Sequence, residues 1–481
     1  MPSTDVRLFV ISLLFCWIFP GSAHSQTLNA RVRITSLAPA RIKIEAEFPE
    51  ACDTLSFHNT YAGIIGLGER IEKVEGFSAS GDSIPVRRLA PGEFRSKIKA
   101  RRFAYDVKLD PPSHTSDMSH VSWLQDENGV LMMADLLPQA GVGGFAHALI
   151  HFEVPAGWHV VSAVPEDKEH RFSSNEPEKA VFLVTPAVQA KTVRVGSTDF
   201  TVAASGKWSF AAGDVMKLAG KLLKDYRRLT ESQLRDRAVL MILPFPGEVG
   251  AERWTGETRG QTVVLLIGRR ATRQQLVGRM GVVLSHELLH LWVPNSLDFK
   301  GDYDWFFEGF TLYQALRADQ RLGFIRFDEF LETLARVYDS YLSVADRDRL
   351  SVTEASKQRW TTSSSLVYDK GMLLAFIYDL TLRNRSNNQV SLDDLYRKLF
   401  RMNPAGSRDA NEVIISLMEG SDISGDFAKT YISRPASIDL GILLKPFGIK
   451  VEQKNSHSRL IVVEGLSDGQ LKVLRSLGYK S

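Results

Sequence analysis

The chain has 481 residues, of which 44% are hydrophobic and 24% are charged, values that are ordinary for a globular protein. One hydrophobic core rarely serves so long a chain, so we expect two to four domains. The net charge of +3 is small for this length, and no basic stretch carries interleaved aromatic residues, so nothing favours nucleic-acid binding.

Residues 1–25 have the features of a secretory signal peptide. An apolar run from Leu8 to Phe19 follows Arg7, and small residues come after Pro20. The run is shorter than the ~20 apolar residues that cross a bilayer, which favours cleavage near residue 25 over a retained anchor. We therefore expect an exported protein, periplasmic or secreted, that is not inserted in a membrane after cleavage. Cys52 would then be the one remaining cysteine, so no intrachain disulfide can form.

The region 26–205 predicts an antiparallel β domain. Segments such as Arg31–Thr35, Arg41–Phe48 and Lys191–Val195 alternate apolar and polar residues, as half-buried strands do. Clusters of turn-forming residues separate these segments. The seven histidines of this region are scattered, and such histidines are more often surface or hydrogen-bonded residues than metal ligands.

After residue 206 the pattern changes to mixed helix and strand, with a helix at Asp214–Tyr226 and strands at Ala238–Leu243 and Thr262–Ile267. A further helix is expected from about Thr272 to Trp292, and helices dominate beyond 304. We therefore expect three more segments in chain order, which are an α/β domain at 206–350, a helical domain at 351–450 and a short tail at 451–481.

The most informative motif lies on the helix that ends near Trp292. Residues four positions apart share a helix face, so His286 and His290 can bind one ion. Glu287 lies beside that face and can reach a metal-bound water. A third ligand is expected from a carboxylate on a second helix, and Glu308 in the aromatic segment Trp305–Phe310 is the best candidate. The pattern predicts one Zn²⁺ per chain and a zinc-dependent hydrolase.

Hydrolysis of a peptide bond also needs a donor for the oxyanion that forms on the carbonyl. Tyr368 stands at the start of an expected helix, from which its hydroxyl could face a cleft. On the residues alone, an interface tyrosine is the simpler interpretation of this position.

These motifs together resemble the gluzincin metallopeptidases and, among them, the glycyl aminopeptidase family. His286–Trp292 ends in the family's His-x-Trp pattern, Trp305–Tyr313 is similar to its second zinc helix, and Val367–Met372 is similar to its tyrosine-containing segment. The resemblance covers about 206–450 and implies that Tyr368 is the catalytic tyrosine. It implies an α+β multidomain fold with an N-terminal antiparallel β domain, a thermolysin-like α/β zinc catalytic domain and a C-terminal α-helical domain. The tail is too short for the PDZ domain that often follows in the family.

The sequence departs from the family pattern in two places. The connection Val293–Asp304 is shorter than is usual, which is expected to reshape one wall of the substrate cleft. Relatives also carry an edge-strand glutamate that holds the free amine of the substrate. Glu257, in the segment Trp254–Val263, is the candidate equivalent, but its flanking residues differ. Arg259 could neutralise Glu257 or bind a substrate carboxylate instead.

The leading interpretation is an exported zinc peptidase acting on a peptide or protein substrate, with Glu287 as general base and aminopeptidase specificity as the first candidate. One alternative is an endopeptidase of the same fold. Another is a binding protein that retains zinc without turnover, with its β domain docking a partner. The sequence leaves the oligomeric state open.

Overall fold

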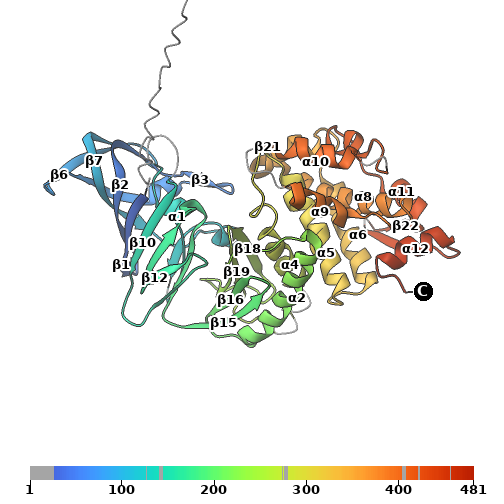
Figure 1. The fold of residues 1–481 in the computed structure, drawn as a ribbon, viewed down its shortest axis with the longest axis horizontal. Coiled ribbons are helices and arrows are strands. Elements are labelled where there is room, and N and C mark those ends of the chain that lie inside the picture. The colour runs from blue at the N-terminus through green and yellow to red at the C-terminus, as the bar shows by residue number, and fades with distance from the viewer. Residues whose placement is uncertain are drawn as a thin grey trace, which may run out of the picture.

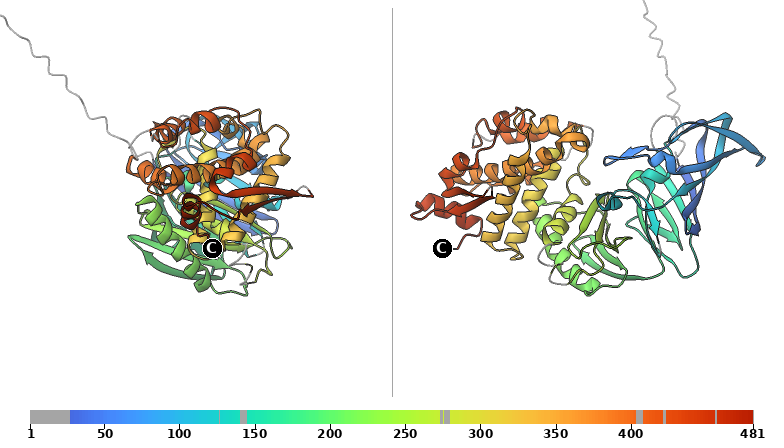
Figure 2. Two further views of the ribbon diagram at one scale, coloured as in Figure 1. Left: turned by 90° about the vertical axis from the view of Figure 1, so that its right-hand side faces the viewer. Right: turned by 180° about the vertical axis from the view of Figure 1, so that it is seen from behind.

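A computed structural model shows three parts that follow one another along the chain, a β part, a central α/β part and a helical part (Figure 1). The view from behind shows the same succession (Figure 2). The structure describes residues 27–480 except 126, 140–144, 273–274, 276–279, 403–407, 421–422 and 456. The expected signal peptide lies outside these residues. No helix within the described part is long and apolar enough to span a membrane.

The N-terminal part contains an eight-stranded sheet and a four-stranded sheet. All neighbouring strands of the large sheet are antiparallel except β1 and β10, which run parallel. In spatial order, the large sheet consists of β12 (Glu166–Lys168), β13 (Arg171–Ser174), β10 (His147–Glu153), β1 (Thr27–Leu37), β2 (Ala40–Ser56), β7 (Glu93–Lys108), β5 (Ile71–Phe77) and β6 (Ser83–Ala90). The small sheet consists of β11 (His159–Val161), β14 (Val181–Thr185), β9 (Asn128–Met132) and β8 (Trp123–Gln125).

The small sheet is buried on both faces. Because side chains along a strand alternate between its two faces, successive residues of this sheet enter two different cores. Leu131 and Phe182 belong to the core beneath the large sheet. Their neighbours Val130 and Val181 pack instead into a second core, which the central sheet completes with residues such as Met241. Apolar contact on both sides therefore joins the β part to the central part.

The central sheet has the order β15 (Val188–Val195), β16 (Thr198–Ser205), β17 (Arg237–Pro244), β19 (Thr262–Ile267) and β18 (Trp254–Arg259). Strands β16, β17 and β19 are parallel, while β15 and β18 run antiparallel at the two edges. Helices α2 (Ala212–Thr230) and α4 (Met280–His290) pack beside it.

This sheet begins earlier in the chain than the expected start of the α/β domain at residue 206. Strands β15 and β16 alternate like the strands before them, and alternation shows that a strand is half-buried without showing which sheet it joins. Their pairing with β17 is a long-range contact that the local pattern does not contain. The strands and helix expected at 214–267 are confirmed as α2, β17 and β19.

The C-terminal part is helical, as expected. It contains the π-helical turn η4 (Trp305–Phe310), α5 (Thr311–Arg321), α6 (Phe327–Ser343), α7 (Val352–Ser356), the turns η5 (Arg359–Ser363) and η6 (Leu366–Lys370), α8 (Gly371–Arg385), α9 (Leu392–Met402), α10 (Ala410–Glu419) and α11 (Leu440–Leu443). The tail forms the hairpin β22 (Ile449–Lys454) and β23 (His457–Val462), followed by α12 (Asp468–Ser476). Val473 and Leu474 of α12 are buried in the same core as α6 and α8, so the tail is part of this helical unit.

Two glycines set the distance between the η4 turn and the helix that follows η6. A Cβ on Gly309 would lie 2.5 Å from the Cα of Gly371 and 2.6 Å from the carbonyl oxygen of Val367. A Cβ on Gly371 would in turn lie 2.8 Å from the carbonyl oxygen of Trp305. Because these neighbours are backbone atoms, no side-chain adjustment relieves the contact.

Replacement of Gly309 by alanine should therefore destabilise the helical part by about 1–3 kcal/mol, the usual cost of overpacking. Gly220→Ala is the matched control, because a Cβ there meets nothing within 4 Å and alanine favours a helix interior by up to ~1 kcal/mol. Urea unfolding followed by circular dichroism gives both values. An unchanged midpoint for Gly309→Ala would show that the backbones can separate freely.

Candidate active site

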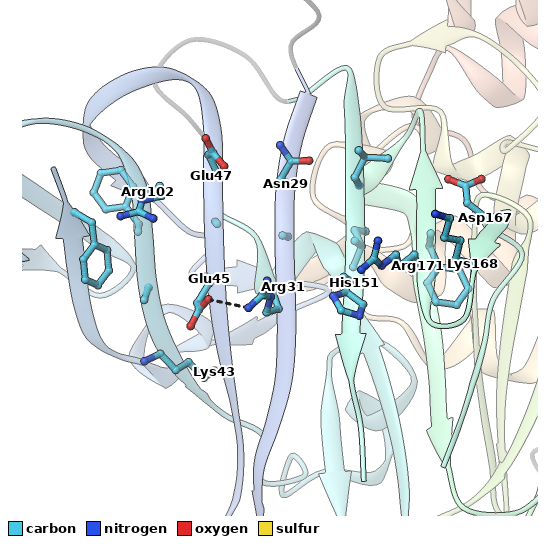
Figure 3. A pocket seen from close by; sticks show the side chains of 18 of the residues that line it. Asn29, Arg31, Lys43, Glu45, Glu47, Arg102, His151, Asp167, Lys168 and Arg171 are labelled. Atoms are coloured by element: carbon cyan, nitrogen blue, oxygen red, sulfur yellow. Dashed lines mark ion pairs between the residues drawn. The ribbon is translucent and has the colours of Figure 1, made fainter. Parts of the chain in front are cut away.

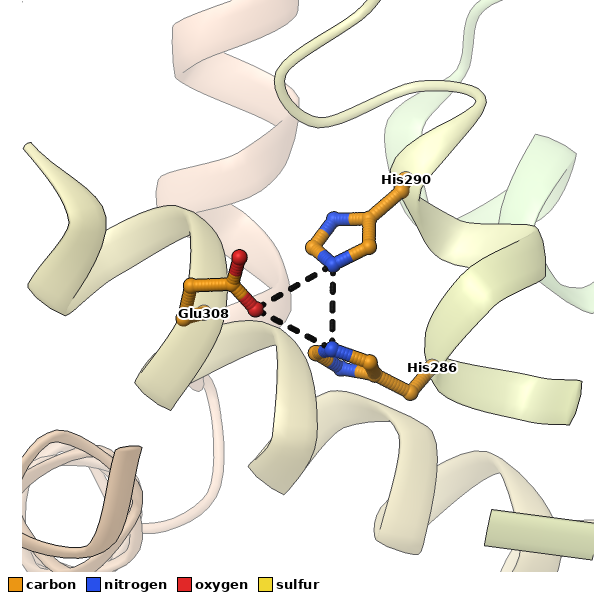
Figure 4. Close-up of side chains that lie close together, drawn as sticks. All are labelled: His286, His290 and Glu308. Carbon is orange, nitrogen blue, oxygen red and sulfur yellow. Dashed lines mark hydrogen bonds and ion pairs between the residues drawn. The ribbon is translucent and has the colours of Figure 1, made fainter. Parts of the chain in front are cut away.

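Three buried side chains from two elements converge on one point (Figure 4). His286 and His290 lie one turn apart on α4, and Glu308 comes from η4. The Nε2 atoms of the two histidines are 3.0 Å apart. The Oε2 atom of Glu308 lies 3.1 Å from Nε2 of His286 and 3.3 Å from Nε2 of His290. The structure thus brings together the three residues predicted as metal ligands.

The electrostatics of this cluster call for a cation at its centre. Nδ1 of His290 lies 2.7 Å from the carbonyl oxygen of Val293, which can only accept, so Nδ1 carries the proton and Nε2 presents a lone pair. That lone pair faces a carboxylate oxygen, and two acceptors approach this closely when a cation lies between them. Burial opposes protonation of His290, but the carboxylate of Glu308 outweighs it and raises the pKa of His290 to about 9. A proton on Nε2 can therefore supply this positive charge, and a metal ion that binds there takes the place of that proton. The donor set of two imidazoles and one carboxylate fits catalytic zinc.

Strand β18 positions Glu287 beside these ligands. The Thr258 hydroxyl lies 2.7 Å from Oε2 of Glu287 and 2.9 Å from its carbonyl oxygen, and it can donate to either. A Cβ on Gly256 would lie 2.9 Å from Cγ of Glu287, so only glycine leaves the carboxylate this space. Sequence reasoning missed both residues, because the pairing of α4 with β18 is a tertiary contact.

An arginine that sequence reasoning also missed joins Glu308 to Tyr368. The Arg359 guanidinium lies 2.7 Å from Oε1 of Glu308 and 2.9 Å from Oδ1 of Asp304, and it donates to the Tyr368 hydroxyl. The guanidinium also stacks on Trp360, and its Cζ atom lies 4.2 Å from the centre of the Trp360 ring. Burial and the charge of Glu308 raise the pKa of the Tyr368 phenol well above its usual value. The phenol therefore keeps its proton at neutral pH and can donate it.

Glu257 lies on β18 next to Gly256, and its carboxylate is held by three groups. The Tyr61 hydroxyl donates to Oε1 at 2.7 Å, and Nε of Arg259 lies 3.4 Å from the same atom. Nδ1 of His120 contacts Oε2. Burial opposes ionisation, but the hydrogen bond and charge of His120, together with Arg259, lower the pKa of Glu257 to about 2. Of the two roles expected for Arg259, the structure shows the pairing with Glu257.

Tyr61 and His120 come from the N-terminal part, from strand β3 (Thr60–Tyr61) and the residue after the turn η2 (Thr115–Ser119). His120 belongs to the group of histidines expected to be hydrogen-bonded rather than metal ligands, and it is hydrogen-bonded here. Its nearness to the site has no local signal, since 137 positions separate it from Glu257. The β part therefore completes one wall of the site.

The short connection Val293–Asp304 is tied to the same wall. The side-chain oxygen of Asn295 accepts from the backbone of Gly260 at 3.0 Å, and its amide group lies 3.0 Å from the carbonyl oxygen of His290. Within the connection, β20 (Phe299–Lys300) pairs with β21 (Arg408–Asp409). The segment thus bridges the edge of the central sheet and the helical part.

Two cavities differ in their relation to this site. One of about 340 Å³ adjoins it and is lined by residues that include Tyr61, Thr258, Arg259 and Asn295. A larger one of about 760 Å³ lies on the face of the eight-stranded sheet, among charged side chains such as Arg31 (Figure 3). Neither lining includes any of the six predicted site residues, but the smaller cavity is lined by Thr258, which holds Glu287.

Comparison with known proteins agrees with this geometry. Residues 279–374 match the model of the M61 glycyl aminopeptidase family, and that range contains both histidines, Glu308 and Tyr368. A comparison with curated protein sequences gives no match.

The fold is similar to that of an aminopeptidase N family protein from Idiomarina loihiensis, with a TM-score of 0.76 and 18% identity over 89% of this chain and 79% of that one. It is also similar to an M1 zinc metallopeptidase from Deinococcus radiodurans, solved as a mutant with a Tyr-Ser-Ala substrate. That TM-score is 0.56, with 9% identity over 86% of this chain and 95% of that one. The expected α+β multidomain fold is confirmed. The chain therefore has the fold of these metallopeptidases, and its segment 279–374, which carries the predicted ligands, is similar to the M61 glycyl aminopeptidase family.

Proposed function

We propose that the chain hydrolyses peptide bonds with one zinc ion held by His286, His290 and Glu308. The convergence of their three donor atoms within about 3 Å of one another carries this proposal. A bound zinc ion supplies Lewis acidity and lowers the pKa of a water to roughly 7. Residues of the chain would supply the general base and the donor to the oxyanion.

Glu287 acts as the general base in this proposal. Its carboxylate takes a proton from the attacking water and passes it to the amine that leaves. The Thr258 hydroxyl and the space at Gly256 fix the direction in which the carboxylate points. Tyr368 donates its hydroxyl to the carbonyl oxygen as negative charge develops there, and Arg359 holds that phenol beside Glu308.

We further propose that the protein is exported after cleavage near residue 25, as the signal-like segment 1–25 indicates. The intact mass of protein recovered outside the cytoplasm should then correspond to a chain that begins near residue 26. Recovery of the uncut chain from the cytoplasm alone would contradict export.

Zinc should stabilise the folded chain because it binds the native site and not the unfolded chain. At free zinc 100 times the dissociation constant, the gain is about 2.7 kcal/mol. Chelator-stripped protein should therefore show a higher thermal midpoint after zinc addition, and metal analysis should give one zinc per chain. His290→Ala should lose this response, whereas His159→Ala, an exposed histidine of β11, should keep it. Equal responses in the two variants would place the metal elsewhere.

Glu287→Gln should retain zinc but lower kcat by about 10²–10⁴-fold, because the amide cannot take a proton from water. Tyr368→Phe should lower kcat by about 10²–10³-fold through loss of one donor to the oxyanion. Glu248→Gln serves as the control, since Glu248 is exposed on a loop. Steady-state kinetics on a peptide panel provide the measurement. Full activity in Glu287→Gln would refute the proposed base.

The contacts of Glu257 help to distinguish cleavage of N-terminal peptide bonds from cleavage of internal ones. A resemblance to glycyl aminopeptidases favours removal of N-terminal residues, with Glu257 binding the substrate amine. The endopeptidase alternative gains support from the structure, because Glu257 already has three partners within the protein.

A further inference from the structure

We infer that substrates of this peptidase need no free N-terminal amine, because Arg259, His120 and Tyr61 occupy the carboxylate that would bind one. The inference rests on the proposed peptidase function and narrows it to a substrate class. That class comprises peptides with an uncharged group at this position, such as N-acylated peptides and internal segments of longer chains.

The hydrogen-bonding capacity of Glu257 is largely used by the protein itself. Oε1 receives the Tyr61 hydroxyl at 2.7 Å and faces Nε of Arg259 at 3.4 Å, and Oε2 contacts His120. A substrate ammonium would have to displace one of these groups to reach either oxygen. Only 15% of the Glu257 side chain is exposed, so there is little open approach to the carboxylate.

The charge of Glu257 is also balanced. A guanidinium stays protonated in proteins, and the Arg259 side chain is only 8% exposed. Its position is fixed because it lies 4.0 Å over the Tyr61 ring and donates to the carbonyl oxygen of His120 at 2.6 Å. The charges of Arg259 and Glu257 thus cancel, without any contribution from His120. Burial lowers the pKa of His120, but Glu257 outweighs this and raises it, which adds positive charge.

Two other carboxylates act on this cluster through their charges. Asp135 acts on Arg259 and is paired with Arg70 at 2.6 Å. Glu287 acts on His120, and the neutral hydroxyl of Thr258 that bonds to it leaves its charge in place. A substrate ammonium that approached Glu257 would still meet the fixed guanidinium of Arg259, and like charges at such distances repel.

A cavity of about 340 Å³ adjoins this cluster. It is lined by Tyr61 and Arg259, which hold Glu257, and by Thr258, which holds Glu287.

The direct test is the ratio of kcat/KM for a matched pair of peptides, one with a free amine and one N-acetylated, on the full zinc-loaded chain. A site built to bind a substrate amine discriminates by orders of magnitude, so about tenfold is the dividing line. A ratio below that supports the inference, and a larger preference for the free amine overturns it. If neither peptide is cleaved while zinc is bound, the proposed function fails and the inference fails with it.

Two variants test which residues are responsible. Arg259→Gln removes the fixed cation, so the preference for the free amine should rise at least about fivefold, as Glu257 becomes able to bind an ammonium. Arg253→Gln is the control, because Arg253 is bonded to Thr115 and precedes the strand. Glu257→Gln leaves the charge of Arg259 unbalanced, so the preference for the free amine should fall, by no more than about tenfold. An unchanged ratio in folded Arg259→Gln, or a fall of about 100-fold or more in Glu257→Gln, would overturn the inference. Should Arg259→Gln fail to fold, the wild-type and Glu257→Gln ratios still decide.

Discussion

The arrangement of the active site depends on one constraint, which is that three electron-pair donors are buried and aimed at a single point. His286, His290 and Glu308 approach one another to about 3 Å, a distance at which imidazole lone pairs and a carboxylate repel unless a positive charge lies between them. A divalent cation satisfies all three at once. The helix α4 and the turn η4 must therefore stay in fixed register, and the surrounding packing serves that requirement.

Backbone contact, rather than side-chain packing alone, maintains this register. Gly309 and Gly371 let the η4 turn rest directly on the start of α8, so the third ligand and Tyr368 belong to one rigid pair of elements. On the other side, Gly256 and Thr258 hold Glu287 against β18. Arg359 then compensates the buried charge of Glu308 and positions the Tyr368 hydroxyl. A buried charge is tolerated when it is paired and hydrogen-bonded in this way.

The N-terminal β part contributes residues to the candidate active site. Its small sheet is packed against the central sheet, and this fixes Tyr61 and His120 beside Glu257. Both residues offer donors to a carboxylate that the resemblance assigns to substrate recognition. Strand β18 therefore links the two groups of residues, because Gly256 and Thr258 hold Glu287 while Glu257, between them in sequence, contacts Tyr61 and His120 of the β part.

The sequence by itself predicted the three ligands that the structure brings together, proposed Glu287 as the general base, and gave the order of the three parts. These depend on local regularities, namely the four-residue spacing of His286 and His290 on one helix face and the change from strand to helix periodicity after residue 206. Only the tertiary structure placed β15 and β16 in the central sheet, brought Arg359 to Glu308, and set Tyr61, His120 and Arg259 around Glu257. These contacts join residues from separate elements, and the last set crosses between two parts of the chain. Their formation follows from how the sheets and helices pack, which no local pattern records.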